Sequence, residues 1–474
     1  MKWRSAVLIL GIIILALVIF ALGTFPNTNN GTGPTQTTST SSRAHTTATT
    51  AVTSKSNSLW PTYHRDNSRT GFDPSARSAA SVRQGWSSPS LDGAVYAEPL
   101  VAGGKVIIAT ENNNVYALND STGQIMWQAQ LGAPVPRSDL PCGDIDPTGI
   151  TSTPVIDSSA RIVYTVAFLR TSHQHWLFAL DLNTGATRMS RAADPPGADP
   201  LVEQQRGALS VSNGIVYVPY GGLFGDCGEY HGWVVGLPAN GTGARLSYQV
   251  PTGRGGGVWA PSGAAINTAG DLLIATGNSF SSSVFDFGDG VIKLSPSLQR
   301  LDWFAPSNWV ELNNADADLG SVGPSLLNSN TIFQIGKDGV GYLVNVSHLG
   351  GFGGQLFSAK VCNAAFGGTA YGAPYLYVPC VDGLVALRVN LGPSRSFTIA
   401  WKGPSFHAEP PILAGGAVWV IDRNGGDLYA LNATSGQTLS MFHLGATVHF
   451  STPSSGDGQV FVAAGNKILS FILG

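Results

Sequence analysis

One stretch recurs along this chain, and it is first seen as Val115-Tyr116-Ala117-Leu118-Asn119-Asp120-Ser121-Thr122-Gly123-Gln124-Ile125-Met126-Trp127. An apolar segment is followed by a turn of small polar residues and Gly, and then by a second segment that ends in Trp. This is the pattern of two short strands joined by a tight turn. Similar stretches return at residues 177–185 and 428–436. Recurrence at intervals of roughly forty to sixty residues indicates a repeat architecture.

The composition agrees with many short strands. Charged residues make up only 12% of the chain, and it contains 59 glycines. Such a balance favours strands joined by tight turns over amphipathic helices. The net charge of −3 provides no basic surface for nucleic acid.

Eight apolar tetrads mark eight units, and another apolar segment precedes each of them. The tetrads lie at residues 115–118, 177–180, 234–237, 291–294, 342–345, 384–387, 428–431 and 468–471. Four short antiparallel strands in each unit, repeated radially, predict an all-β, eight-bladed β-propeller.

The last unit lacks an outer strand of its own, because the sequence stops at Gly474. A spare apolar segment, residues 82–86, precedes the first unit. We expect it to complete the final blade and so remove two open sheet edges. The Trp of the repeat is expected to cover the Gly turn of the neighbouring blade, with its ring N–H bonded to a carbonyl.

The N-terminal region differs from the rest. Lys2 and Arg4 precede a long apolar run, so residues 1–25 predict a transmembrane anchor, with a cleaved signal peptide as the alternative. Residues 26–57 are Ser- and Thr-rich and predict a disordered tether. Residues 58–474 would then form the propeller on the extracytoplasmic side of the cell membrane, as a single-pass protein.

The only cysteines are Cys142, Cys227, Cys362 and Cys380. Four cysteines in an exported chain indicate two disulfides and allow three pairings, and four buried thiols are the alternative. We favour Cys142 with Cys227 and Cys362 with Cys380. The histidine pair His173 and His175 has no metal-ligand context, and we expect it at the surface.

The repeat Ala-Leu-(Asn/Asp)-x-x-Thr-Gly-x-x-x-Trp resembles that of the pyrroloquinoline quinone (PQQ) propellers. The segment at residues 60–71, Trp-Pro-Thr-Tyr-His-Arg-Asp-Asn-Ser-Arg-Thr-Gly, is similar to the opening of exported members of that superfamily. The likeness runs from about residue 60 to residue 473. It implies the propeller fold, but the superfamily contains both quinoprotein dehydrogenases and non-catalytic scaffolds.

The resemblance also implies a cofactor site. Glu229 and Asn278 look like the calcium ligands of the quinoprotein dehydrogenases. Trp259, after three glycines, is similar to the tryptophan beneath their cofactor, and the turn that contains Lys337 resembles the one whose cation approaches the quinone.

Asp316 and Asp318 occupy the place of the catalytic aspartate, and Asp316 is the third candidate calcium ligand. The Trp that flanks this Asp in the enzymes is absent, so the choice between the two stays open.

These residue types suit PQQ chemistry. Ca²⁺ prefers oxygen ligands and polarises a quinone carbonyl. An aspartate takes the proton of an alcohol or sugar hydroxyl as hydride leaves. The cation of Lys337 stabilises the negative charge that develops, and the ring of Trp259 covers one face of the cofactor.

Each residue also has a structural alternative. Glu229 and Lys337 suit solvated loops, Trp259 suits core packing, and Asn278 and Asp318 are common in turns. Two features of the enzymes are missing: Cys142 is single where they have adjacent cysteines, and residues 144–154 contain no arginine to bind a cofactor carboxylate.

Two functions follow from the resemblance. The first is a PQQ- and calcium-dependent dehydrogenase of an alcohol or sugar. The second is a non-catalytic propeller that binds envelope proteins or glycans. In both cases we expect a monomer that attaches to the membrane by its N-terminal helix and does not bind nucleic acid.

Overall fold

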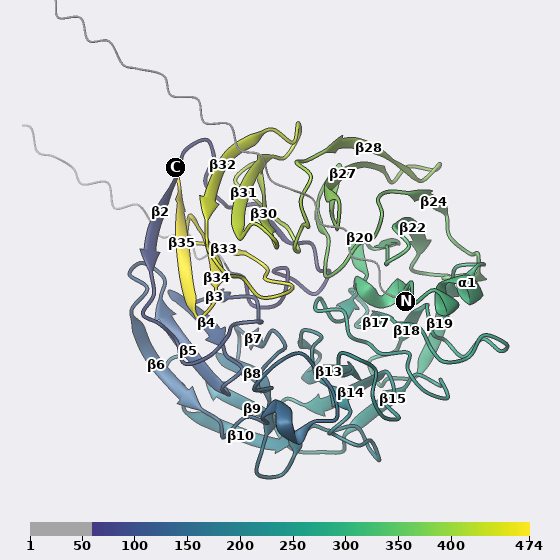
Figure 1. Ribbon diagram of the computed structural model, residues 1–474, viewed down its shortest axis with the longest axis horizontal. Coiled ribbons are helices and arrows are strands. Elements are labelled where there is room, and N and C mark those ends of the chain that lie inside the picture. The colour runs from purple at the N-terminus through teal and green to yellow at the C-terminus, as the bar shows by residue number, and fades with distance from the viewer. Residues whose placement is uncertain (1–58) are drawn as a thin grey trace, which may run out of the picture. The chain divides into compact units, whose positions relative to one another are not determined.

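The computed structural model describes residues 59–474 and places them in eight sheets, which Figure 1 shows arranged around one axis. The predicted anchor, residues 1–25, and the predicted linker, residues 26–57, lie outside the described residues. Between residues 59 and 474, no helix has both the length and the apolar character needed to span a membrane.

The first four blades follow one another along the chain. They comprise β3 (Leu100–Ala102), β4 (Lys105–Ala109), β5 (Asn114–Asn119) and β6 (Ile125–Gln130) in blade 1; β7 (Val155–Asp157), β8 (Ile162–Leu169), β9 (Gln174–Asp181) and β10 (Thr187–Ala192) in blade 2; β12 (Ser210–Ser212), β13 (Ile215–Gly222), β14 (Trp233–Pro238) and β15 (Leu246–Gln249) in blade 3; and β16 (Ala265–Ile266), β17 (Leu272–Ala275), β18 (Val291–Leu294) and β19 (Arg300–Ala305) in blade 4.

The remaining four blades complete the circle. They comprise β20 (Ser325–Asn328), β21 (Thr331–Gln334), β22 (Val340–Asn345) and β24 (Phe357–Lys360) in blade 5; β25 (Ala370–Gly372), β26 (Tyr375–Cys380), β27 (Gly383–Asn390) and β28 (Ser396–Lys402) in blade 6; β29 (Ile412–Ala414), β30 (Ala417–Asp422), β31 (Asp427–Asn432) and β32 (Thr438–His443) in blade 7; and β33 (Ser454–Gly456), β34 (Gln459–Ala464), β35 (Lys467–Leu473) and β2 (Val82–Ser87) in blade 8. The predicted all-β, eight-bladed propeller with four-stranded blades is therefore confirmed.

Short elements extend the blades or link them. They are β1 (Phe72–Asp73) beside β29, β11 (Glu203–Gln204) beside β13, β23 (Gly351–Phe352) beside β19, the 3₁₀ turns η1 (Arg137–Asp139) and η2 (Leu319–Ser321), and the helix α1 (Trp309–Asn314).

The ring closes as the spare N-terminal strand predicted. In blade 8, β2 pairs antiparallel with β35, and Val82 lies opposite Leu473. Figure 1 shows these two strands side by side, although they come from opposite ends of the described chain. Each end of the propeller thus supplies part of one sheet, which removes the open edges.

The repeat turn explains how neighbouring blades are joined. The side-chain oxygen of Asn119 accepts the backbone N–H groups of Ser121 and Thr122, and Gly123 follows in the left-handed region at φ +72°. Trp86, from the neighbouring blade, covers Gly123 and donates its ring N–H to the carbonyl of Asp120 at 2.8 Å. Trp127 covers Gly185 and Trp401 covers Gly436 in the same way, so this prediction is also confirmed.

The segment at residues 60–73 binds several blades at their innermost strands. Backbone carbonyls within it accept hydrogen bonds from Ile156, Ile266, Leu326, Tyr371 and Leu413, which belong to or directly adjoin the first strands of blades 2, 4, 5, 6 and 7. Arg69, fully buried within this segment, donates hydrogen bonds to side-chain and backbone oxygens of surrounding residues. The segment therefore fastens the centre of the ring.

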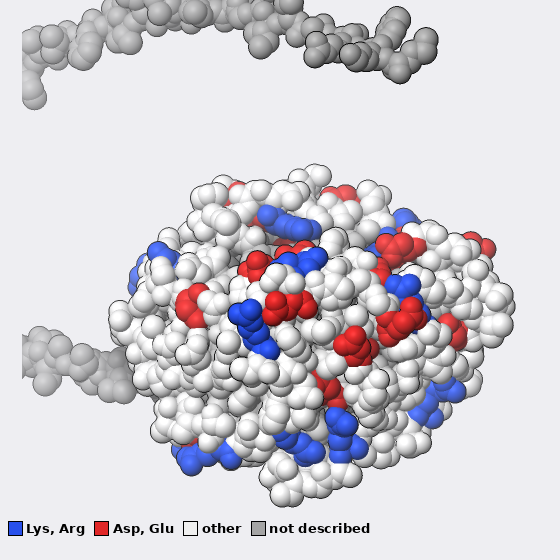
Figure 2. All heavy atoms as spheres, turned by 60° about the horizontal axis from the view of Figure 1, so that its bottom comes forward, with Lys and Arg blue, Asp and Glu red and all other residues white. Residues whose placement is uncertain are grey.

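Both favoured disulfides are present, Cys142–Cys227 and Cys362–Cys380. The expectation that His175 lies at the surface is wrong. Its side chain is buried and its Nδ1 lies 2.8 Å from Asp194, because its ring packs between Phe168 and Tyr220. Figure 2 shows acidic and basic side chains interspersed on one face of the propeller, so neither sign of charge dominates that face.

Candidate functional site

A cavity of about 530 Å³ is lined by loops from several blades. Five of the predicted site residues line it: Trp259, Asn278, Asp316, Asp318 and Lys337. Trp259 lies between β15 and β16, Asn278 follows β17, the two aspartates follow α1, and Lys337 follows β21. Residues that are nearly eighty positions apart in the sequence thus meet in one space, within the size range of small-molecule sites.

Asp318 and Lys337 form the polar centre of this cavity. The Asp318 side chain is only 5% exposed, and its second carboxylate oxygen is paired with the Lys337 ammonium. The other oxygen accepts the backbone N–H of Asn278. Burial raises the pKa of Asp318, while Lys337 acts in the opposite direction. A buried carboxylate held by one cation is poised to exchange a proton with a bound hydroxyl.

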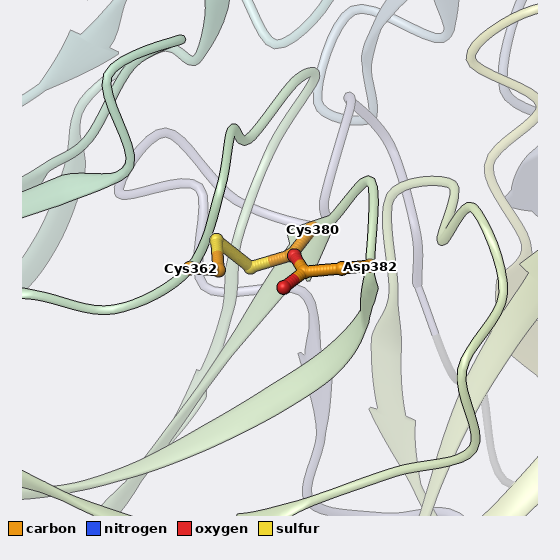
Figure 3. Close-up of side chains that lie close together, drawn as sticks. All are labelled: Cys362, Cys380 and Asp382. Carbon is orange, nitrogen blue, oxygen red and sulfur yellow. A yellow bond between two sulfur atoms is a disulfide. The ribbon is translucent and has the colours of Figure 1, made fainter.

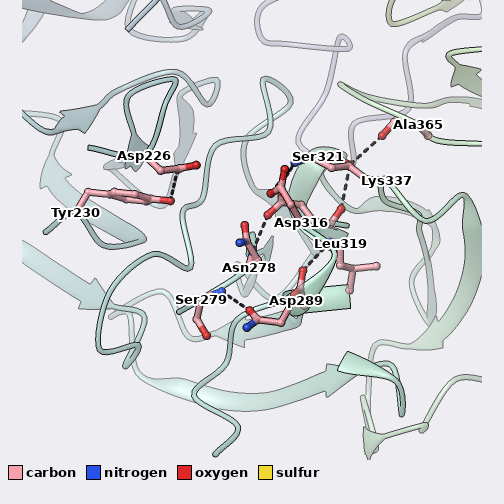
Figure 4. Close-up of polar contacts among 12 residues, drawn as sticks. Asp226, Tyr230, Asn278, Ser279, Asp289, Asp316, Leu319, Ser321, Lys337 and Ala365 are labelled. Carbon is pink, nitrogen blue, oxygen red and sulfur yellow. Dashed lines mark hydrogen bonds and ion pairs between the residues drawn. The ribbon is translucent and has the colours of Figure 1, made fainter. Parts of the chain in front are cut away.

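Asp316 differs from Asp318, although Lys337 touches both. Its side chain is 70% exposed, and its Oδ1 lies 3.1 Å from the ammonium of Lys337 (Figure 4). Burial alone would lower the pKa of Lys337, but Asp318 and Asp316 together raise it. The structure therefore distinguishes two candidates that the sequence left equal: Asp318 is enclosed and Asp316 lies at the solvent side.

A second buried carboxyl lies behind this pair. Asp289 is fully buried, directly before β18, and accepts the backbone N–H of Leu319 at 2.9 Å (Figure 4). Burial and the nearby charge of Asp318 raise the pKa of Asp289 to about 8. Sequence reasoning missed this residue, since an Asp between two glycines is indistinguishable from a turn residue.

Glu229 is not brought to the cavity. Its side chain is 79% exposed, and the nearest cation is Arg254 at 4.0 Å. Its neighbours explain this placement: Cys227 is held in a disulfide, and the hydroxyl of Tyr230 donates a hydrogen bond to Asp226 at 2.6 Å (Figure 4). The turn between these fixed points leaves Glu229 in solvent, which differs from its predicted place among the calcium ligands.

The comparisons with known proteins agree with this architecture. A family model of PQQ-repeat proteins, described as "Outer membrane protein assembly factor BamB", matches residues 68–221. No curated protein matches the chain at a significant level.

Solved structures match much more of the chain. A quinohemoprotein alcohol dehydrogenase from Pseudomonas putida HK5 is 15% identical, with a TM-score of 0.69 over 89% of this chain and 81% of that one. A europium-containing methanol dehydrogenase is 14% identical, with a TM-score of 0.69 over 88% and 99%. BamB from Moraxella catarrhalis is 16% identical, with a TM-score of 0.54 over 83% and 98%.

The fold is that of a PQQ-repeat propeller. At these identities the likeness establishes the fold and not the activity. The side chains that this propeller places in its cavity therefore indicate its function.

The three predicted calcium ligands do not assemble in this propeller. Asn278 and Asp316 line the cavity, but Glu229 does not, and the wall presents the amide of Gln204 instead. The adjacent Glu203 is buried and its carboxyl accepts the backbone N–H of His231 at 3.1 Å. Glu229 is therefore not available as a ligand, although Asp144, Asp226 and Asp318 add carboxylates to the cavity wall.

Elsewhere in residues 59–474, one group of three His, Cys, Asp or Glu side chains is close enough to share a metal. It consists of Cys362, Cys380 and Asp382 (Figure 3). The two sulfurs are bonded to each other, so neither offers the thiolate that binds metals.

Two arginines that were not predicted from the sequence line the cavity. The region after Cys142 lacks an arginine, but Arg206 and Arg423 line the cavity from blades 3 and 7. Arg137, by contrast, donates hydrogen bonds to the carbonyls of Gly143 and Leu140 and holds their loop. A single sequence offers no periodic signal for such residues, because their loops follow no repeat.

The Cys142–Cys227 disulfide borders the cavity without the adjacent-cysteine ring of the enzymes. Gly225 lines the cavity, and a Cβ at this position would lie 3.5 Å from that of Cys142. The disulfide thus links the connection between blades 1 and 2 to the loop between β13 and β14 of blade 3.

Proposed function

We propose that the cavity binds PQQ and that the protein is a dehydrogenase of alcohols or sugars. The observation that carries this proposal is that Trp259, Asp318 and Lys337, which come from three separate loops, line one cavity. The dehydrogenases with the same fold add support at the level of architecture.

The residues present fit a planar polyanion. The Lys337 ammonium lies 5.9 Å from the centre of the Trp259 ring, so a positive charge stands beside an aromatic face. A planar heterocycle stacks on such a ring, and its carboxylates are attracted to the cations of the wall. When bound, PQQ supplies a quinone that accepts hydride.

The chain's own residues supply the proton chemistry. Asp318 accepts the proton of the substrate hydroxyl, and the effect of burial on its pKa makes it a stronger base than an exposed aspartate. Lys337 holds the carboxylate of Asp318 in place and provides positive charge where negative charge develops. Asn278 positions Asp318 through its backbone N–H.

The requirement for Ca²⁺ is considered separately from PQQ binding, because Glu229 lies outside the cavity. We propose that PQQ binding does not require Ca²⁺, since Glu229, one of the three predicted ligands, lies in solvent. The same titration with added Ca²⁺ and with a chelator tests this point. A loss of PQQ binding in the chelator would instead restore calcium as a cofactor.

The test is a titration of the full-length protein in detergent with PQQ. We expect Tm to rise by a few degrees and dye-linked oxidation of an alcohol or sugar to appear. Asp318→Asn should keep the rise in Tm and lose turnover, whereas Arg188→Gln, an exposed residue of β10, should change neither. Absence of both effects at saturating PQQ would exclude the proposal.

The match of residues 68–221 to the BamB family model, together with the exposed Glu229, favours a second candidate. In that case the propeller is a non-catalytic scaffold that binds envelope proteins or glycans. The PQQ titration separates the two, because a scaffold gains neither stability nor activity from the cofactor.

We also propose that the protein is a monomer, anchored in the cell membrane by residues 1–25 with the propeller on the extracytoplasmic side. The two disulfides support exposure to an oxidising compartment. Protease treatment of intact cells should digest the propeller if it faces outward, and protection until lysis would contradict that topology.

A further inference from the structure

A second group of cations lies in the cavity, apart from Asp318 and Lys337. Arg206 follows β11 in blade 3, and Arg423 follows β30 in blade 7. The chain brings them together across more than two hundred residues. A guanidinium group offers a planar set of donors that matches a carboxylate.

Neither arginine has a full counter-ion. Asp144, Glu111 and Glu409 act on Arg206 electrostatically, but none of them forms an ion pair with it in the described chain. Arg423 has Glu409 at 3.9 Å. Burial raises the pKa of Glu409 to about 8, so this carboxyl carries little charge at neutral pH. Both guanidinium groups line the cavity, so a bound carboxylate would supply the matching anion that the protein itself does not provide.

His449 lines the cavity together with the two arginines. Burial lowers its pKa to about 2, and the charges of Arg423 and Arg206 act in the same direction. Both guanidinium groups therefore lie close enough to His449 to disfavour its protonation. His449 stays neutral there and leaves the two guanidinium groups as the charged donors.

A row of rings connects this group to Lys337. The guanidinium of Arg206 lies 4.7 Å from the centre of the Phe450 ring, and Phe450 lies 6.4 Å from Trp259. The ammonium of Lys337 in turn lies 5.9 Å from the centre of the Trp259 ring. Aromatic faces therefore link cations from two different walls.

We propose that Arg206 and Arg423 bind the carboxylates of a planar aromatic polycarboxylate that lies along Phe450 and Trp259 and extends toward Lys337. The assignment of PQQ as this ligand rests on the proposed function, while the ligand class rests on the cations and rings alone. These arginines thus replace the missing arginine after Cys142.

The test is calorimetric titration of the full-length protein with PQQ and, separately, with trimesate, a planar aromatic tricarboxylate that accepts no hydride. We expect the native protein to bind both, with affinity that falls as salt is added. Arg206→Gln and Arg423→Gln should each weaken both ligands by about tenfold or more. Arg188→Gln, which removes an exposed arginine, should bind as the native protein does.

The outcomes separate this inference from the proposed function. Native affinity for PQQ and trimesate in both arginine variants would overturn the inference even if PQQ-dependent oxidation is observed. Arginine-dependent binding of trimesate without PQQ-dependent oxidation would support the inference and exclude the dehydrogenase. Arg423 is partly exposed, so its variant should fold even if Arg206→Gln does not, and failure of the native protein to bind either ligand would also overturn the inference.

Discussion

Asp318 and Lys337 form an ion pair in the wall of the cavity, where Asp318 is almost fully enclosed. Replacing Lys337 by Met leaves a buried carboxylate without its cation, which we expect to cost about 3 kcal/mol of unfolding free energy. Urea denaturation at neutral pH measures the loss. Asp318→Asn in the Lys337→Met background should recover part of it, because the buried charge is removed.

The exposed pair of Arg188 and Asp181 serves as the control for this prediction. Arg188→Gln should cost less than about 1 kcal/mol, as is usual for surface ion pairs. If Lys337→Met costs no more than Arg188→Gln, then the ion pair of Lys337 is solvated and the cavity does not enclose Asp318.

Asp289 predicts a pH dependence of stability. Its pKa is raised to about 8 in the folded protein, whereas an unfolded aspartate has a pKa of about 4. Between these values the folded state binds the additional proton, so this residue makes stability fall as pH rises from about 4 to 8. The full benefit is present below about pH 4 and is lost above about pH 8.

Asp289→Asn isolates this effect. The Asn side-chain oxygen can still accept the N–H of Leu319, while the titrating proton is removed. We expect the decline of unfolding free energy with pH to become shallower, by up to about 1.4 kcal/mol for each pH unit. Urea denaturation from pH 5.5 to 8.5 measures the slope, and an unchanged slope would show that Asp289 is ionised in the folded protein.

The blades were predictable because their determinants are local. The Asn119 side chain, the left-handed Gly123 and the short apolar segments act within a few positions, so the strands and the turn of each repeat can be predicted from its own residues. The closing strand was predictable for a related reason: the apolar segment that begins at Val82 had no other partner, and the last sheet lacked a strand.

The cavity was predictable only in part. A run of three glycines precedes Trp259, and Asn278 and Lys337 each follow a glycine just after a strand. The geometry of the ring brings these positions together. Glu229 was misplaced because its loop is set by a disulfide bond between distant residues and not by the repeat. Arg206 and Arg423 were missed because they lie in loops of different blades, and only the assembled ring brings them to one cavity.

The two disulfides differ in the length of chain that they close. Cys142 and Cys227 are separated by 85 residues, and Cys362 and Cys380 by 18. In the chain-entropy account the longer loop stabilises more, about 4–5 kcal/mol against about 3 kcal/mol. The double Ala variant of each pair, unfolded in urea, should show this order, and the reverse order would mean that the loop of Cys142 stays ordered after unfolding.

Gly123 and Trp86 make the contact that seals blade 8 against blade 1, and a pair of glycine variants can measure it. An Ala Cβ at Gly123 would lie 2.3 Å from the Trp86 ring, so the indole must move and its hydrogen bond to Asp120 must stretch. Gly416 has a similar left-handed φ of +79° against +72° at Gly123, but open space surrounds its Cβ position. Both Ala variants therefore carry the same backbone cost of about 1 kcal/mol. Gly123→Ala should cost about 1–3 kcal/mol more than Gly416→Ala in urea denaturation, because only the first displaces a packed side chain. Equal losses would mean that Trp86 does not hold the two blades together.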